Sequence, residues 1–569
     1  MRCKALLILC FILVVGCSRK AEPPGIRRIA IPPAENLTGR ADLDWVAYAV
    51  SQVAASALMG APGVHPVPVR SARDAAAGGA VSLLLIRYGL RDGALEFRAD
   101  VRSVQAQRTE LSFFIKSPPE NPALAAGEQI AKRISGRARA FGTASEQALH
   151  EYAMALQGGS ADEVIAGLRR ALELDAAFGE SWVALVQTLA ETGRRQEALK
   201  ALAEARQAGN KVQELERARL DWLGASLEGD LPGQVRALAV VTRLLPGDVV
   251  ALSAAARAEQ AMEHYPEAAA WFRKAAAADP QPATWWNQAL YASAFAGDWT
   301  GVEAAFHAYR KAAPEDPNAF DSFGEAAFHL GRFADADKAF GEAYRLNSGF
   351  LSGRTLYKAA LAQWAGGNRQ KAAERFREFM EARRNEGDPL CAYWEARWLH
   401  LNGDSAAALE KLQTWVASAA EGDPKAIGLA QMAVWQMATD RQKPAEETSR
   451  RALAAARTPL ARTAASAAAI VCAGRAPEQA PDAWIAYRLL LAGKTAEAIP
   501  LLERIRKRGT PSETGAATAL LAWAYLETGK QEEARRLAGR FPIPSAGADD
   551  LFEFLIYPRF LAVRKALGM

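Results

Sequence analysis

The spacing of hydrophobic and polar residues changes twice along the 569-residue chain. An unbroken apolar run from Ala5 to Val15 follows the basic residues Arg2 and Lys4. Between residues 26 and 140, most apolar residues gather in short runs that predict strands. Beyond about residue 145 the spacing is helical almost throughout, and the strand signals disappear. The pattern predicts an α+β protein, in which a small N-terminal mixed α/β domain precedes a long all-α superhelical solenoid.

The region 26–140 is predicted to hold a small sheet with helices on one face, in the order β-α-β-β-β-β-α. Arg91-Asp92-Gly93 joins two strands, because Asp-Gly is a strong signal of a tight hairpin turn. Prolines interrupt the second strand, which places it at an edge of the sheet. The predicted strands are Arg28–Ile31, Val64–Val69, Ser82–Tyr88, Leu95–Ser103 and Leu111–Ile115, and the predicted helices are Asp42–Met59 and Pro122–Arg137.

The helical region repeats with a period of about 34 residues. One position, the turn between two helices, recurs at steps of 34 or 36, and glycine there can take a positive φ. Its occupants are Gly193, Gly229, Glu263, Gly297, Gly331, Gly367 and Gly403, with Gly493 and Gly529 resuming the series. Prolines at 246, 280 and 314 follow the second helix of their pairs. Residues 424–475 are Ala-rich, and their repeat register stays open.

Two copies carry a resemblance to the tetratricopeptide repeat (TPR). Their matching residues are Trp182, Leu185, Gly193, Ala198, Leu202 and Ala205 in one copy, and Phe320, Gly324, Ala327, Gly331, Ala336, Phe340 and Ala343 in the other. The resemblance implies a TPR solenoid over residues 145–545 and a non-catalytic role in binding proteins. A C-terminal helix within 546–569 is expected either to cap the last repeat or to dock elsewhere.

In TPR arrays the first helix of each pair lines the inner groove, at five recurring positions. A concave wall of aromatic, amide and charged groups suits an extended peptide, although solvated faces would have the same composition. The positions that the resemblance assigns to this groove are Asn287, Tyr291, Asn318, Asp321, Glu325, His329, Tyr357, Trp364, Tyr393, Arg397 and His400.

The N-terminal apolar run spans about 11 residues, too few for a membrane helix of roughly 20. A basic start followed by a short apolar core is typical of a secretory signal. Val14-Val15-Gly16-Cys17 resembles the lipobox of bacterial lipoproteins, which implies removal of residues 1–16 and acylation of Cys17. Residues 17–25 would then be the lipidated Cys and a tether, and Ser18 after the Cys favours the outer membrane. An ordinary signal with an incidental Cys is the alternative.

The start of the α/β domain resembles TolB-like proteins and the FlgO and CsgG kind of lipoprotein domain. Ile29-Ala30-Ile31-Pro32-Pro33-Ala34-Glu35-Asn36-Leu37-Thr38-Gly39 and Leu43-Asp44-Trp45 carry this resemblance. The chain departs from the family after Gly79-Ala80, where the usual later glycine is missing. The resemblance implies an accessory or assembly role in the cell envelope, and it implies no catalytic residues.

Composition narrows the function. The 69 Lys and Arg residues exceed the 64 Asp and Glu residues by five, which gives a net charge of +5. This excess is too small and too widely dispersed to indicate a nucleic-acid binder. The six His are scattered, no catalytic or phosphate-binding motif is present, and we predict no metal, no cofactor and no enzyme activity. Cys391 and Cys472 are expected to be buried, unpaired thiols.

The sequence therefore predicts a lipid-anchored scaffold on the periplasmic face of the outer membrane, which binds proteins or peptides in its TPR groove. A sensory lipoprotein that binds a ligand or glycan through its α/β domain is the first alternative. An enzyme with a site assembled across the solenoid is the second. Partner identity, biological process and oligomeric state stay open.

Overall fold

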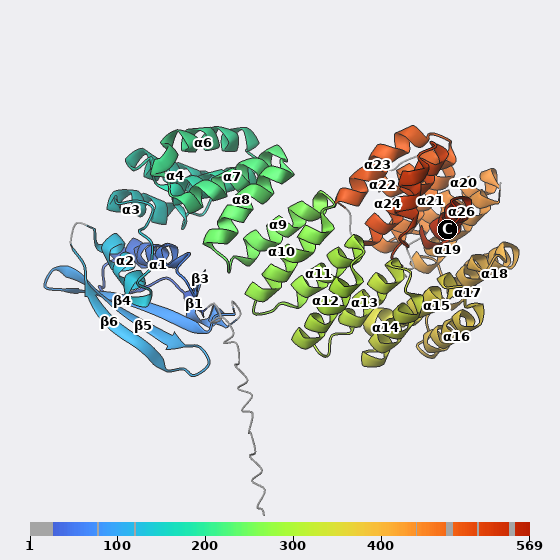
Figure 1. Ribbon diagram of the computed structural model, residues 1–569, viewed down its shortest axis with the longest axis horizontal. Coiled ribbons are helices and arrows are strands. Elements are labelled where there is room, and N and C mark those ends of the chain that lie inside the picture. Colours follow the sequence, from blue (N-terminus) through green and yellow to red (C-terminus); the bar gives the residue numbers. More distant parts are fainter. Residues whose placement is uncertain are drawn as a thin grey trace, which may run out of the picture. The chain divides into compact units, whose positions relative to one another are not determined.

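The computed structural model describes residues 27–76, 79–118, 121–439, 441–473, 482–508, 511–544 and 552–569 (Figure 1). The predicted signal, Cys17 and the tether lie outside the described residues. Contacts divide the chain into two compact units. The first unit runs to Leu220 and includes Arg243–Gly247, and the second holds Asp221–Thr242 and Asp248–Met569.

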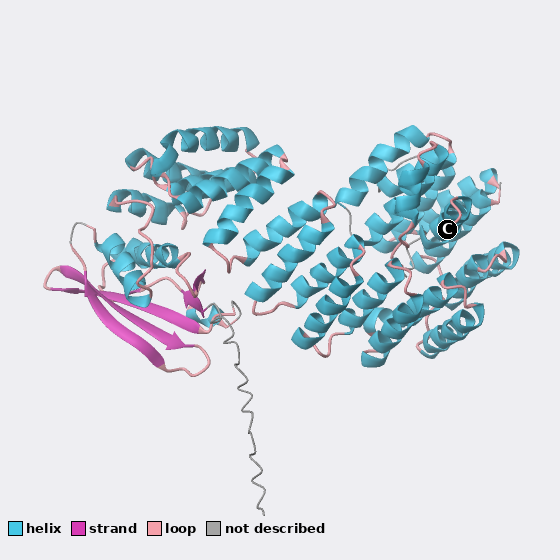
Figure 2. Ribbon diagram, in the orientation of Figure 1, coloured by secondary structure: helices cyan, strands magenta, loops and turns pink. Residues whose placement is uncertain are grey.

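The first unit opens with one mixed sheet, the only strands among the described residues (Figure 2). Its order is β3-β1-β4-β5-β6, with β2 paired to β4. β1 runs parallel to both β3 and β4, whereas β4, β5 and β6 are antiparallel neighbours. The strands are β1 (Arg27–Ile31), β2 (Glu35–Asn36), β3 (Val64–Pro68), β4 (Ser82–Arg91), β5 (Ala94–Ser103) and β6 (Thr109–Lys116).

Helices α1 (Asp44–Leu58) and α2 (Pro122–Ile134) cover one face of this sheet (Figure 1). They approach closely because Gly127 has no side chain, and a Cβ there would lie 2.6 Å from Cβ of Val53. The predicted order of strands and helices is confirmed, and so is the edge position of the Pro-interrupted strand β3. The sequence pattern missed β2, which is two residues long.

The rest of the described chain is helical. Helices α3 to α6, α9 to α20 and α22 to α25 pack as consecutive pairs, and α21 packs against both α19 and α20. The first ten of these helices are α3 (Glu146–Ala155), α4 (Ala161–Leu174), α5 (Gly179–Glu191), α6 (Arg195–Ala208), α7 (Glu214–Glu228), α8 (Leu231–Leu244), α9 (Val249–Ala261), α10 (Tyr265–Ala278), α11 (Ala283–Ala296) and α12 (Trp299–Ala312).

The remaining helices all belong to the second unit. They are α13 (Pro317–His329), α14 (Phe333–Leu346), α15 (Thr355–Ala365), α16 (Arg369–Asn385), α17 (Cys391–Leu401), α18 (Ser405–Ser418), α19 (Asp423–Ala438), α20 (Gln442–Ala455), α21 (Pro459–Ala473), α22 (Asp482–Leu491), α23 (Thr495–Arg508), α24 (Pro511–Glu527), α25 (Gln531–Ala538) and α26 (Phe552–Ala566).

Every predicted turn position has a positive φ, from 62° at Glu263 to 92° at Gly403. This backbone conformation lets the second helix of a pair fold back onto the first. Glu263 adopts it at a steric cost that the glycines avoid. The fold is therefore a small mixed sheet domain followed by a TPR-type solenoid, as predicted.

Within the second unit the array curves until a late helix meets an early one. Nη2 of Arg506 on α23 lies 2.9 Å from Oε2 of Glu263, at the turn after α9. The last helix, α26, packs against α24 and α25 and also reaches α17. The C-terminal helix therefore joins the last helices of the array to α17, one of the four helices that carry predicted groove residues.

Both cysteines of the helical array, Cys391 and Cys472, are unpaired thiols. Cys472 is buried, and burial raises its pKa to about 12. Cys391 is only half-buried, because it is the first residue of α17 and lies at the rim of its repeat. The prediction of two buried thiols is thus confirmed for Cys472 and wrong for Cys391.

Candidate partner-binding groove

The first helices of four successive pairs, α11, α13, α15 and α17, carry all eleven residues predicted to line the groove. Six of these residues are buried and five are half-buried, so none is fully exposed. The buried ones are Asp321, His329, Tyr357, Trp364, Tyr393 and Arg397, and the half-buried ones are Asn287, Tyr291, Asn318, Glu325 and His400. The expectation of an open groove surface is therefore wrong for the six buried residues. A role of these residues in partner binding stays a prediction.

A buried ion cluster occupies the wall between α13 and α15. Nζ of Lys358 lies 2.9 Å from Oδ2 of Asp321 and 2.6 Å from Oε1 of Glu325. The hydroxyl of Tyr291 on α11 donates to Oε2 of Glu325 at 2.6 Å. Three consecutive repeats thus share one polar network inside the array.

The charges of this cluster depend on one another. Burial raises the pKa of Asp321 to about 6, even though Lys358 lowers it. Burial alone would lower the pKa of Lys358, but Asp321 and Glu325 together raise it above its ordinary value. The ammonium group is therefore a fixed positive charge that two carboxylates neutralise. Sequence reasoning missed Lys358, although it adjoins the predicted Tyr357.

Arg397 on α17 lies among aromatic rings. Its guanidinium carbon is 5.2 Å from the ring centre of Tyr393, 5.0 Å from that of Trp394 and 5.9 Å from that of Tyr357. Nη1 also donates to the Tyr393 hydroxyl at 3.2 Å. Aromatic faces attract a cation, so this arrangement holds a fully buried guanidinium in place.

The other predicted residues have separate surroundings. His400 stacks on Trp435 with ring centres 4.5 Å apart, and burial lowers the pKa of His400 to about 4. Nδ2 of Asn318 donates to the hydroxyl of Tyr309 on α12 at 3.0 Å. The Arg369 guanidinium covers the Trp364 ring. The predicted set is therefore not one continuous site.

His329, at the end of α13, contacts the C-terminal part of the chain. The backbone N–H of Phe541 donates to the carbonyl oxygen of His329 at 2.9 Å. Nδ1 of His329 lies 2.6 Å from the carbonyl oxygen of Phe541, so this nitrogen carries the donated proton. Burial, together with the positive charge of Arg540, lowers the pKa of His329 to about 4. The histidine is therefore neutral at pH 7.

This neutral histidine predicts an acid-sensitive second unit. The folded-state pKa of about 4 lies below the ordinary 6.5, so the unfolded chain binds more protons between these values. The stability that the neutral His329 side chain contributes to the folded state is fully present above pH 6.5. It is lost as the pH falls through 4. We expect the difference in free energy of unfolding between wild type and His329→Gln to shrink by about 3 kcal/mol over this window.

Urea titrations followed by tryptophan fluorescence measure this difference, because only Trp45 and Trp182 of the fourteen tryptophans belong to the first unit. Asp321 titrates in the same window with the opposite sign, but it is present in both proteins and cancels. His307→Gln, at an exposed position on α12, serves as the matched control. A wild-type minus variant difference that stays constant from pH 6.5 to 4 would contradict the assignment.

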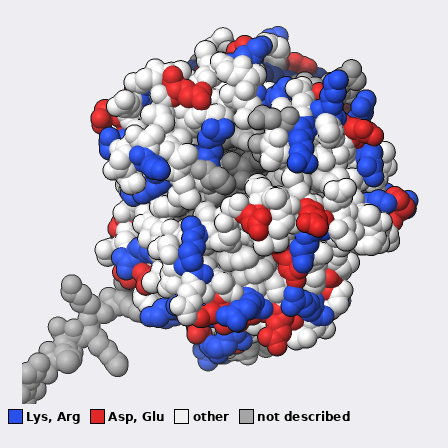
Figure 3. All heavy atoms as spheres, turned by 90° about the vertical axis from the view of Figure 1, so that its right-hand side faces the viewer, with Lys and Arg blue, Asp and Glu red and all other residues white. Residues whose placement is uncertain are grey.

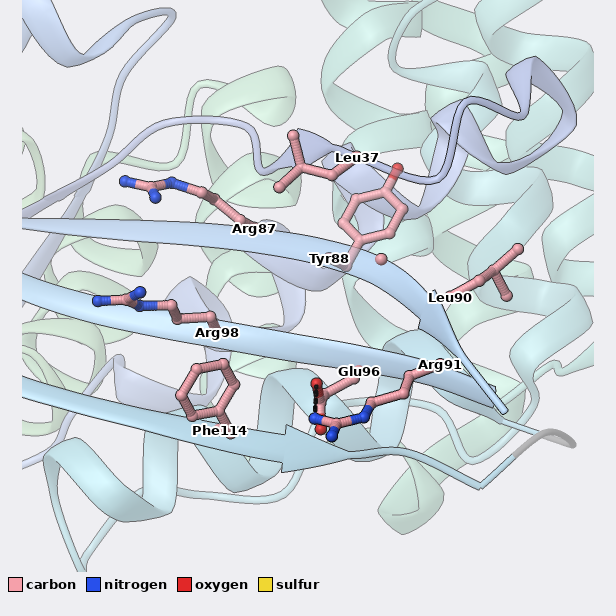
Figure 4. Close-up of a pocket in the computed structure, with 9 residues that line it drawn as sticks. Leu37, Arg87, Tyr88, Leu90, Arg91, Glu96, Arg98 and Phe114 are labelled. Carbon is pink, nitrogen blue, oxygen red and sulfur yellow. Dashed lines mark hydrogen bonds and ion pairs between the residues drawn. The ribbon is translucent and has the colours of Figure 1, made fainter. Parts of the chain in front are cut away.

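The α/β domain carries the second candidate surface, a shallow depression of about 350 Å³ on the sheet (Figure 4). Arg87 and Arg98 extend side by side along it, next to the exposed ring of Phe114 (Figure 4). Arg87 pairs with Glu35 at 3.3 Å, and Arg98 pairs with Asp100 at 3.2 Å. Arg91, the third arginine of the depression, pairs with Glu96 at 3.5 Å. The depression therefore combines apolar and cationic groups, and each of its three arginines is already paired with a carboxylate.

Two further features, a metal-binding cluster and a membrane-spanning helix, are absent from the residues that the structure describes. No group of three or more His, Cys, Asp or Glu within them is placed to hold a metal ion. None of the described helices combines the length and apolar character that crossing a membrane requires. On the face that Figure 3 presents, basic and acidic side chains are interspersed rather than gathered into fields of one sign.

No protein-family model matches the chain, and no curated protein matches it. Among solved structures, it is similar to MamA (17% identity, 30% of this chain and 93% of that chain, TM-score 0.25). It is also similar to a tetratricopeptide repeat protein from Parabacteroides merdae (14% identity, 44% and 98%, TM-score 0.27) and to yeast Tom70 (13% identity, 68% and 89%, TM-score 0.30). The TPR-type class rests on this chain's own helical pairs and turns.

Proposed function

We propose that this protein is a non-enzymatic scaffold of the bacterial cell envelope, anchored by lipid on Cys17, that binds partner proteins through its TPR-type array. The observation that carries the proposal is the pairing of Phe541 with His329. Here the last residue of a repeat's first helix makes two hydrogen bonds to the main chain of a segment without helix or strand, one from its carbonyl oxygen and one from its side chain, and the aromatic side chain of that segment is buried. Hydrogen bonds to a main chain, combined with a pocket for a side chain, are a recurring mode of peptide recognition. The apolar run and lipobox-like residues before Cys17 support the anchor.

Site-specific photo-crosslinking in native membranes tests the binding role. A photoreactive residue replaces Asn287 or Asn318 on the half-buried groove side, and Lys338 at an exposed position on α14 as control. We expect one envelope protein to be cross-linked from both groove positions and not from the control. Identical products from all three positions, or none from any, would refute groove binding. Loss of membrane association and of radiolabelled palmitate in Cys17→Ala tests the anchor separately.

The depression beside Arg87 and Arg98 favours one alternative, a regulatory lipoprotein that senses a ligand or glycan through its α/β domain. Exposed Phe114 and Leu37 could stack on an apolar or sugar ring, while the arginines meet its polar groups. A ligand-dependent rise in melting temperature that Phe114→Ala abolishes in the full chain would support this alternative.

A further inference from the structure

A short segment without helix or strand, Arg540–Pro544, joins α25 to the C-terminal part of the chain. We call it the strap. Its main chain pairs with His329 in both directions, as described above. The His329 carbonyl lies in the last turn of α13, where carbonyl groups lack partners within the helix. The strap therefore satisfies a group that the array leaves open.

Four of the strap's five side chains, those of residues 541–544, are buried like those of a bound peptide. Phe541 is 7% exposed, and its ring meets those of Phe328, Phe333 and Phe560 edge-on at 6.1, 4.9 and 5.6 Å. Pro542, Ile543 and Pro544 are buried as well. Proline favours an extended chain and has no N–H to leave unpaired, so Phe-Pro-Ile-Pro is suited to lie in a groove without secondary structure.

On the other side of the strap, helix α24 allows the strap's backbone to approach closely. Gly515 lies inside helix α24, where glycine costs about 1 kcal/mol of helix stability relative to alanine. A Cβ at Gly515 would lie 3.0 Å from the backbone nitrogen of Ile543 and 3.4 Å from Cα of Pro542. The Tyr557 hydroxyl on α26 donates to the Pro542 carbonyl at 2.7 Å. Helices α13, α24 and α26 thus form one site around the strap.

The buried ion cluster of Lys358, Asp321 and Glu325 pairs its charges without any group from the strap. Lys358 is neutralised by Asp321 and Glu325 of the array itself. Arg540, the one charged residue of the strap, forms no ion pair among the described residues. If the strap left the site, apolar surface would become exposed, but no buried charge of this cluster would lose its partner. Such an occupant can be exchanged at lower cost than one held by buried ion pairs.

We propose that the strap is an intramolecular occupant of a peptide site, and that a partner protein replaces it with an extended segment in which an aromatic residue precedes Pro-aliphatic-Pro. This inference rests on the proposed function and names its partner chemistry. The tethered strap competes at the high local concentration that a short connection provides. The full chain therefore has a closed state, in which the strap is bound, and an open state that receives the partner.

A labelled peptide with the sequence of residues 537–544, Leu-Ala-Gly-Arg-Phe-Pro-Ile-Pro, tests the exchange by fluorescence polarisation. We expect the full-length Phe541→Ala variant to bind it at least tenfold more tightly than the wild type, because its own strap competes less. The same peptide with Ala for Phe should not bind, and adding His329→Ala should abolish binding. A folded Phe541→Ala variant that binds no tighter than the wild type overturns the proposal.

If Phe541→Ala fails to fold, hydrogen exchange on the wild-type protein tests the proposal instead. We expect the Phe541 amide to exchange through local opening, at least tenfold faster than the slowest amides of α13, and faster still with excess unlabelled peptide. Exchange as slow as in α13, unaffected by peptide, means that the strap is a fixed part of the fold. Photo-crosslinks from Asn287 and Asn318 would then leave the scaffold role standing while this inference falls.

Discussion

Lys358→Met is expected to lower the free energy of unfolding of the second unit by about 3–5 kcal/mol. The substitution keeps the length and apolar stem of the side chain but removes the charge that neutralises Asp321 and Glu325. The Asp321 and Lys358 side chains are 6% and 3% exposed, so water cannot replace the lost partner. Urea unfolding followed by tryptophan fluorescence measures the loss.

Lys371→Met is the matched control for this prediction. Lys371 is also a repeat lysine paired with a buried aspartate, Asp337, at 2.8 Å, but its side chain is 46% exposed. Asp337 keeps Arg375 at 2.7 Å and Gln363 at 2.8 Å, so we expect a loss below about 1 kcal/mol. Equal losses in the two variants would contradict a special role for the Lys358 cluster.

The pH dependence of Lys358→Met gives a second readout. Asp321 already has a pKa raised to about 6, and removal of the lysine raises it further. A folded carboxyl group with a raised pKa binds more protons than the unfolded one, so stability falls as the pH rises through that window. The deficit of Lys358→Met should therefore shrink when the pH is lowered from 7 to 5. A deficit that stays the same between pH 7 and 5 would show that altered packing around the new side chain, rather than the unpaired carboxylates, causes the loss.

Local backbone requirements explain which parts of the fold were predictable. The turn series from Gly193 to Gly529 was correct at every position because each turn needs a positive φ, which the sequence marks with glycine. Even Glu263, which breaks the residue pattern, could be placed from the period alone. The hairpin at Asp92-Gly93 was predictable for the same reason, since it depends only on neighbouring residues.

The contacts of the strap could not be predicted, because they join residues that lie far apart in the sequence. A repeat pattern indicates which helix of a pair faces inward, but not what fills the space inside. Here the filling segment carries Phe541, 212 residues away from its partner His329. The sequence predicted a cap, or docking elsewhere, only for the helix within 546–569, and it assigned no role to residues 540–544. The pairing of Lys358 with Asp321, one repeat apart, also becomes visible only when the helices are stacked.

Arg139→Met is expected to destabilise the first unit by about 3–5 kcal/mol, for a reason related to that at Lys358. Nη1 and Nη2 of Arg139 donate to the two carboxylate oxygens of Glu216 at 2.9 and 2.8 Å, and Nη2 lies 3.4 Å from Oε1 of Glu180. Nε also donates to the carbonyl oxygen of Ser56 on α1 at 2.9 Å. One guanidinium thus joins the α/β domain to helices α5 and α7 within the first unit.

The loss should be large because the two carboxylates would remain behind. The Glu216 and Glu180 side chains are 1% and 10% exposed, and burial already raises the pKa of Glu180. Urea titrations with hydrogen exchange read on peptides of α1, α5 and α7 would locate the change. Arg194→Met is the matched control, since its partner Asp162 is 88% exposed, and we expect exchange there to match the wild type. If Arg139→Met speeds hydrogen exchange in α1 alone, the arginine stabilises only the α/β domain and does not join that domain to α5 and α7.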